Sequence, residues 1–87
     1  MGKDTLLEFP TEFPIKAMGR DNDEFRKTVI DLVACHAVFD PARDVKIQAS
    51  SKGNYASVTV TLTAESQEQL DRIYQSLHDH ELVLMVF

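Results

Sequence analysis

The chain has 87 residues and a formal net charge of −5, so it is long enough for one domain with one core. Its nine Lys and Arg residues are scattered, which argues against a nucleic-acid surface or an anionic membrane as partner. The single cysteine, Cys35, excludes an internal disulfide, and no apolar run approaches the ~20 residues that cross a bilayer, so we expect a cytoplasmic protein.

The first predicted element is an N-terminal arm over residues 1–12, whose apolar stretch would pack on a sheet face or edge. Pro14 cannot donate a ladder hydrogen bond, so the first strand should begin near Ile15 and end at Gly19. Its expected inward-facing residues are Phe13, Ile15 and Ala17, and its expected outward-facing residues are Lys16 and Met18.

A helix is predicted after the turn that follows Gly19. Asp21 and Glu24 have the spacing of a capping box at a helix start. Apolar positions then recur with helical spacing as far as His36, and Asp40-Pro41 ends the pattern just after Phe39. The residues on this predicted face are Phe25, Val29, Leu32, Val33 and His36.

Two strands joined by a hairpin follow this helix. Residues 45–50 alternate between apolar and polar side chains, and the alternation is even more regular over 57–63. Gly53 and Asn54 tolerate the positive φ angles that a tight hairpin needs, so Ser51–Asn54 is the predicted loop.

A second helix and a last strand complete the chain. Ser66 and Gln69 form a capping box, and the apolar positions from Leu70 to Leu77 have helical spacing. The segment 78–80 ends this helix. Residues 81–87 are almost wholly apolar and are predicted to form the last strand.

The order strand–helix–strand–strand–helix–strand predicts an α+β ferredoxin-like sandwich, a single domain over 1–87. Its four-stranded antiparallel sheet carries both helices on one face, with strands one and three central and strands two and four at the edges. The expected core comprises Ile15, Phe25, Val29, Leu32, Val33, Val45, Ile47, Val58, Val60, Leu62, Leu70, Ile73, Leu77, Leu82 and Leu84.

This fold leaves one sheet face without helices, and apolar residues of the last strand should lie on that face. The expected interface residues are Met18, Val83, Met85 and Phe87. An exposed apolar edge invites pairing, so we expect self-association, through edge pairing or face-to-face stacking. The alternative is a monomer in which the N-terminal arm covers the edge.

Chemistry-bearing residues are few. Cys35 lies within the first predicted helix and is interpreted as a small buried or half-buried hydrophobe. His36 is a core-face residue beside it, and His78 and His80 stabilise a helix end, so no metal site is expected. The sequence indicates no catalytic set of nucleophile, base and orienting group, so we predict neither an enzyme nor a cofactor.

Two loops remain as candidate binding elements. Residues 50–55 combine many hydrogen-bonding groups with Lys52, so they could hold a small anion, although a plain hairpin explains them equally. Residues 19–21 occupy a strand-to-helix junction, where backbone N–H groups are available to a ligand. Ordinary helix capping is the alternative explanation of the second loop.

Two blocks of residues identify a relative. The chain resembles the YbeD-like family of small uncharacterised bacterial proteins over nearly its whole length. The resemblance rests on Leu6–Pro10, Phe13, Lys16, Met18-Gly19, Ser50–Tyr55 and Ser57-Val58. It implies a fold similar to the ACT-type regulatory domains of amino-acid-metabolism enzymes, which usually dimerise and bind small effectors near the loop after strand one.

Together these features predict a non-enzymatic, ACT-like regulatory or small-molecule-sensing domain. It would act in trans, because the resemblance implies no attached catalytic domain, and a link to lipoate metabolism is suggested. Its expected effector contacts are Gly19, Arg20 and Asp21. The alternative is a protein-interaction adaptor that uses the open sheet face and the C-terminal edge strand. Expected partners are a small-molecule effector, a protein or a second copy, with neither nucleic acid nor membrane.

Overall fold

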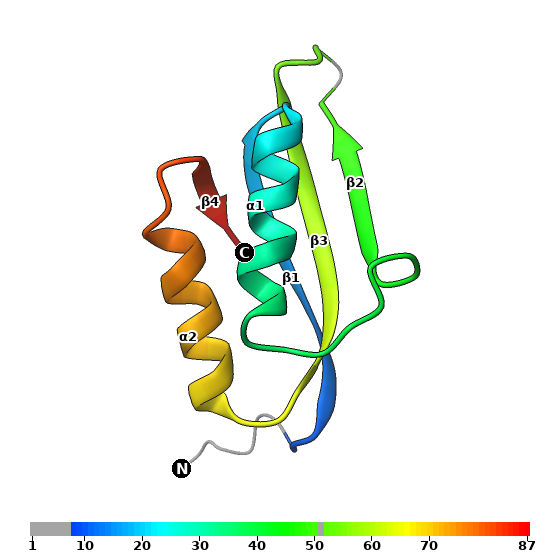
Figure 1. The fold of residues 1–87 in the computed structure, drawn as a ribbon, viewed down its shortest axis with the longest axis vertical. Helices are drawn as coiled ribbons and strands as arrows, with labels where there is room; N and C mark the ends of the chain where they lie inside the picture. The colour runs from blue at the N-terminus through cyan, green and yellow to red at the C-terminus, as the bar shows by residue number, and fades with distance from the viewer. Residues whose placement is uncertain (1–7, 51) are drawn as a thin grey trace.

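The computed structural model describes residues 8–50 and 52–87. Its elements are β1 (Thr11–Arg20), α1 (Asp23–Ala34), β2 (Val45–Ala49), β3 (Tyr55–Ala64), α2 (Gln67–His78) and β4 (Val83–Val86). Both helices lie on the same face of the sheet (Figure 1). The predicted ferredoxin-like βαββαβ sandwich is therefore confirmed.

The sheet has the strand order β2-β3-β1-β4, and each neighbouring pair is antiparallel. β1 and β3 are central, as the sequence predicted. They pair along their whole length without a register shift, from Thr11 opposite Ala64 to Arg20 opposite Tyr55. This long ladder fixes which side chains face the helices and which face away, because strand side chains alternate between faces.

β1 begins at Thr11, four residues before the expected start at Ile15. Lys16 N–H donates to the carbonyl of Phe87, and Phe87 N–H donates back to the carbonyl of Lys16. Pro14 lies two residues earlier, so its nitrogen faces the same side but beyond the end of β4. A proline there forfeits no ladder bond, and the strand passes through it.

The core lies between the helices and the two central strands. Most of the expected core residues are confirmed as buried. The buried apolar residues are Ile15, Ala17, Phe25, Val29, Val33, Ala56, Val58, Val60, Leu62, Ala64, Leu70, Ile73, Leu77 and Val83. Leu32, Val45 and Leu82 are half-buried and pack against this set.

The prediction that Ile47 is a core residue is wrong. Its side chain points to the helix side of the sheet, opposite Val58, yet it is 44% exposed. The reason is that neither helix lies over β2, which stands clear of both in Figure 1. Burial at an edge strand depends on how far the helix layer extends, and that layer stops at β3.

The predicted facing of β4 is also wrong at two positions. Val83 is 9% exposed and lies in the core, whereas Leu84 is 56% exposed. The pairing with β1 shifts by one residue between Met18 opposite Met85 and Gly19 opposite Val83. Leu84 is the extra residue at this bulge, so the strict alternation assumed from the sequence is interrupted there.

The start of α1 differs from the predicted capping box. Asn22, rather than Asp21, is the N-cap, and its side chain accepts a hydrogen bond of 2.7 Å from Phe25 N–H. The Asp21 carboxylate instead pairs with the guanidinium of Arg26. Asn is among the preferred N-cap residues, and Asp23 and Glu24 then occupy the first turn, where the helix dipole favours them.

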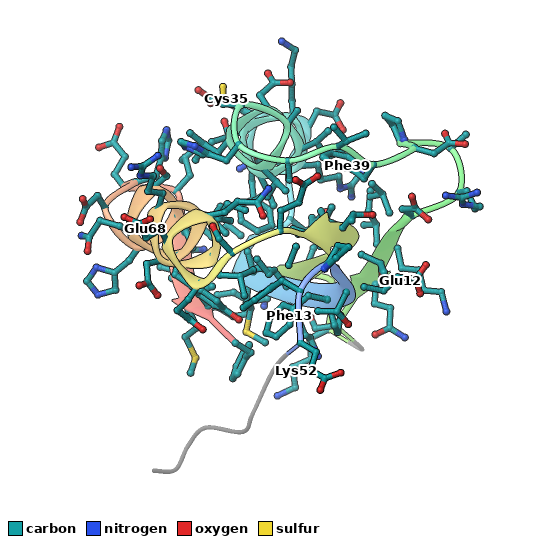
Figure 2. The ribbon with its side chains drawn as sticks, turned by 90° about the horizontal axis from the view of Figure 1, so that it is seen from below. Glu12, Phe13, Cys35, Phe39, Lys52 and Glu68 are labelled. Atoms are coloured by element: carbon teal, nitrogen blue, oxygen red, sulfur yellow. The ribbon has the colours of Figure 1, made fainter. Side chains whose placement is uncertain are left out.

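α1 ends at Ala34, five residues before the expected end near Phe39. The carbonyl of Val33 accepts from both His36 N–H and Ala37 N–H at 3.0 Å, which closes the last turn. Cys35 is therefore the exposed C-cap residue, not a buried one, and Figure 2 shows it on the side of α1 away from the sheet.

The predicted capping of α2 is confirmed, with one difference. The Ser66 hydroxyl accepts a hydrogen bond of 3.1 Å from Gln69 N–H. The difference is that the side-chain oxygen Oε1 of Gln69 accepts from the N–H of Glu65, at 2.6 Å, and not from that of Ser66. The Gln69 amide also donates to the carbonyl of His36 at 2.7 Å, and the ring of His36 lies 3.3 Å from the Ser76 hydroxyl. These contacts hold the end of α1 against α2.

A turn over residues 40–44 leads into β2. The Asp44 carboxylate accepts from Asp40 N–H at 2.9 Å and pairs with the Arg43 guanidinium at 2.9 Å. The hydrogen bond from Arg43, and then that from Asp40, lowers the pKa of Asp44 below its ordinary value. The carbonyl of Asp44 accepts from Thr61 N–H at 2.9 Å, which sets the register of β2 on β3.

Gly19 occupies the tightest place in the fold. A Cβ added there would lie 2.5 Å from the carbonyl oxygen of Leu82 and 2.5 Å from the ring of Phe25. The absence of a side chain thus lets β1, the start of α1 and the segment before β4 converge. Gly53, by contrast, has a φ of +74° and open space around it.

Replacing Gly19 by Ala should therefore lower the free energy of unfolding by roughly 1–3 kcal/mol, the usual cost of overpacking. Urea unfolding followed by far-UV circular dichroism measures this loss. Gly53→Ala is the control, because it strains only the backbone and should cost about 1 kcal/mol or less. Equal losses for both variants would show that the Phe25 ring and the Leu82 carbonyl can move aside, so that packing does not require glycine at position 19.

Candidate functional site

The helix-free face of the sheet is organised in rows across the strands. Lys46 on β2 and Lys16 on β1 both pair with Thr59 on β3. The backbone bonds between Lys16 and Phe87 extend this row to the end of β4. The strand registers therefore place one lysine on each side of the Thr59 hydroxyl, and the Phe87 ring lies at the end of the row.

The next row is less charged. It contains Gln48, Ser57, Met18 and Met85, which are paired in that order across the sheet. A cavity of about 190 Å³ opens beside Met18, Ser57 and Tyr55. Ser57 is buried, whereas its neighbour Gln48 on β2 is exposed.

Large apolar side chains are exposed at the β4 end of both rows. Met85 is 52% exposed and Phe87 is 53% exposed, with the half-buried Met18 beside Met85. The ammonium of Lys16 lies 5.8 Å from the centre of the Phe87 ring, within the range of a cation–π contact. Of the expected interface residues, Met18, Met85 and Phe87 lie on this face, and the buried Val83 does not.

The face is basic although the chain is acidic. Lys16, Arg20 and Lys46 lie on it, and the strand alternation places Glu12 there as their acidic counterpart. None of the three cations lies within 4.0 Å of a carboxylate in the part of the chain that the structure describes. The predicted alternation had already placed Lys16 on the outward face, but the register was needed to show that Arg20 and Lys46 lie on the same face.

Arg20 ends the β1 side of this face. Its guanidinium carbon lies 5.7 Å from the centre of the Tyr55 ring, its partner across the ladder. Tyr55 lines the cavity and is exposed, and Arg20 beside it is exposed as well. Arg20 is therefore the member of the predicted effector loop that faces solvent.

The other two members of that loop are already engaged. Gly19 is buried under Phe25, as described above. Asp21 donates its N–H to the carbonyl of Asn54 at 3.1 Å and pairs its carboxylate with Arg26. This hydrogen bond joins the loop after β1 to the β2–β3 hairpin. These are the two loops that the sequence indicated as candidate binding elements.

A second, smaller cavity of about 140 Å³ lies on the other side of this loop. Arg20 and Glu81 place opposite charges on its wall, and the rest of the lining comprises Asn22, Phe25, Leu82 and Leu84. Opposite charges beside an apolar floor match a small zwitterion with an apolar side chain.

Within residues 8–50 and 52–87, no three His, Cys, Asp or Glu side chains are grouped to hold a metal ion. Burial raises the pKa of Tyr74, whose hydroxyl donates to the carbonyl of Phe87 at 3.2 Å and so helps to fix the end of β4. His80 accepts from Leu82 N–H at 3.1 Å, which orders the turn before β4.

Comparison with known proteins places the chain in a family. The family described as "Protein of unknown function (DUF493)" matches residues 4–87, and the chain belongs to it. A UPF0250 protein of Neisseria meningitidis serogroup A is 48% identical over 84 residues, covering 97% of this chain and 92% of that protein. A UPF0250 protein of Bordetella parapertussis is 42% identical over 87 residues, with the same coverage of both chains. These matches confirm the resemblance to the YbeD-like proteins.

A solved structure supports the fold independently. The solution structure of protein HP0495 from H. pylori superposes with a TM-score of 0.73, covering 98% of this chain and 89% of that one. The two sequences are 15% identical, so this likeness speaks to the fold alone. In the described residues, no helix is long and apolar enough to cross a membrane.

The bulge in β4 makes a testable distinction between two neighbouring apolar residues. Val83→Ala should lower the free energy of unfolding by roughly 1–3 kcal/mol, because it leaves a cavity in the core. Met85→Ala should change it by about 0.5 kcal/mol or less, because Met85 is exposed. Urea titration measures both, and a larger loss at Met85 than at Val83 would contradict the observed facing.

Proposed function

We propose that this chain is a non-enzymatic adaptor whose helix-free sheet face docks another protein. The observation that carries the proposal is that the exposed Met85 and Phe87 share one face of the sheet with a row of cations. Apolar anchors surrounded by polar groups are the usual anatomy of a protein-docking surface. The partner should offer apolar side chains together with carboxylates.

The apolar part of the face supplies the anchor. Methionine side chains adapt to irregular partner surfaces, and Met18 and Met85 lie next to each other across β1 and β4. Phe87 adds a rigid ring whose position is held by the backbone bonds to Lys16. Water released from this patch on docking would be the main favourable contribution to binding.

The charged part of the face supplies orientation. Lys16 and Lys46 flank Thr59, so a carboxylate that settles over the middle of the row meets two ammonium groups and a hydroxyl. Such charges steer encounter and fix register more than they add affinity. Docking should therefore weaken as salt rises, since exposed charges are screened over about 8–10 Å at physiological salt.

A regulatory role acting in trans is compatible with this face. A module without catalytic residues can change another protein only by binding to it, and the helix-free face is the surface with anchors for that. The ACT-like idea of small-molecule sensing is retained as a second candidate, because Arg20 and Glu81 line one small cavity beside the loop after β1.

The adaptor proposal is tested by affinity capture from a bacterial lysate, with Met85→Lys and Lys16→Glu as variants. Met85→Lys adds a charge of the same sign as the face, so a loss of binding reports the apolar contact alone. Lys16→Glu reverses one charge of the row. Each should reduce capture of the partner at least tenfold, a loss of about 1.4 kcal/mol.

Matched controls lie off the face. Val38→Lys alters an exposed apolar residue between α1 and β2, and Arg72→Glu reverses an exposed charge on α2. Both should capture the partner as the unaltered chain does. Equal capture by all four variants would remove the proposal, as would captured material that disappears on nuclease treatment.

The sensing candidate is tested by thermal shift with free α-amino acids. Arg20 would bind the carboxylate and Glu81 the ammonium group. At ~100 times Kd, binding would add about 2.7 kcal/mol and raise Tm by more than about 10 °C. Arg20→Ala and Glu81→Gln should abolish the shift, with Arg72→Ala as the control. No shift with any amino acid would eliminate this candidate and leave the adaptor proposal untouched.

A further inference from the structure

The outer edge of β2 presents unpaired backbone groups. The carbonyl of Asp44 and the N–H of Ser50 both bond to β3. Backbone direction alternates along an antiparallel strand, so the N–H and C=O groups of Val45, Ile47 and Ala49 point outward. The strand order places β2 at the edge of the sheet, with no described strand beyond it.

β2 lacks the features that protect the other edge. β4 has four residues and pairs with a bulge, and α2 packs against it. β2 has five residues, pairs with β3 in one continuous register and contains no proline. Neither helix covers it (Figure 1), and the exposed Ile47 lies on its helix side. An uncovered edge with outward-pointing backbone groups is a template for another strand.

We propose that a second copy of this chain pairs with β2, antiparallel and with the two-fold axis at Ile47. Two Ile47 residues would then exchange backbone hydrogen bonds, because their N–H and C=O groups point outward. Val45 of each copy would lie opposite Ala49 of the other, where the outward groups again match. The two sheets would become one continuous sheet with all helices on one side.

The sequence of β2 is self-complementary in this register. Lys46 lies opposite Gln48 of the second copy, and the two exposed Ile47 side chains cover each other. Moving the axis to Lys46 would place two lysines directly opposite, which is destabilising. Moving it to Gln48 would leave Ile47 facing only Ala49.

Charge also favours edge pairing over the two ways of stacking copies. The helix-free face carries Lys16, Arg20 and Lys46, so two such faces repel each other. α1 and α2 together carry five acidic residues against the three cations Arg26, Lys27 and Arg72, so two stacked helix layers would also bring charge of the same sign together. Side-by-side pairing does not bring either surface face to face with its copy.

The mass in solution tests the proposal. Sedimentation equilibrium of the unaltered chain should give twice the 9.8 kDa monomer mass at micromolar to submillimolar concentration. Ile47→Lys places two like charges at the axis and should raise the dimer Kd at least tenfold. Ile47 is exposed in the single copy, so the variant should keep its far-UV spectrum and Tm.

Leu84→Lys is the matched control, because it adds the same charge at another exposed apolar residue, on the far edge of the sheet. It should leave the dimer Kd unchanged. A monomer at all concentrations, or equal weakening by Ile47→Lys and Leu84→Lys, would overturn the proposal.

Cross-linking tests the register itself. In a Cys35→Ser background, Ile47→Cys would put two thiols on a hydrogen-bonded pair, whose Cα atoms lie about 5.5 Å apart, within the ~4.4–6.8 Å of a disulfide. Mild oxidation should give a covalent dimer within minutes. Gln48→Cys should not, because its two copies would be separated by more than ~7 Å. Faster cross-linking through Gln48→Cys would overturn the Ile47 axis.

Discussion

The uninterrupted pairing of β1 with β3 is the constraint on which the rest of the structure depends. It runs from Thr11 opposite Ala64 to Arg20 opposite Tyr55, so both strands have one fixed alternation over their full length. On one side this produces the core beneath the helices, and on the other it aligns Lys16 with Thr59. A slip of one residue would exchange the two faces, so the core and the candidate docking face are specified together.

Gly19 is the position at which β1, α1 and the segment before β4 pack most closely. The residue lies at the end of this ladder, in contact with the Phe25 ring and the Leu82 carbonyl. The register shift of β4 lies at the same place, between Met18 and Gly19, and leaves Leu84 out of the pairing. The bulge then carries Val83 into the core and leaves Met85 and Phe87 on the open face. One position in the sheet thus separates the buried residue of β4 from the exposed ones.

The sequence could predict those features that depend on local patterns. Alternation in β3, the Ser66–Gln69 cap and the order of elements are each written within a few consecutive residues. Residues 81–87 are apolar at nearly every position, so no polar partner marks the facing and the bulge was invisible. The exposure of Ile47 depends on the width of the helix layer, and the row from Lys46 to Phe87 depends on three separate registers. Both are tertiary properties that no local pattern records.

Lys46 connects the docking face with the β2 edge. It lies on the open face next to Ile47, so pairing two copies at Ile47 would place both Lys46 residues close to the axis. The basic rows of the two copies would then form one continuous surface with an apolar anchor at each outer end. A partner that reaches both anchors would bind with an effective concentration set by its own geometry, and its avidity would exceed that of one copy. Loss of pairing would therefore weaken docking of a two-site partner without any change in the face itself.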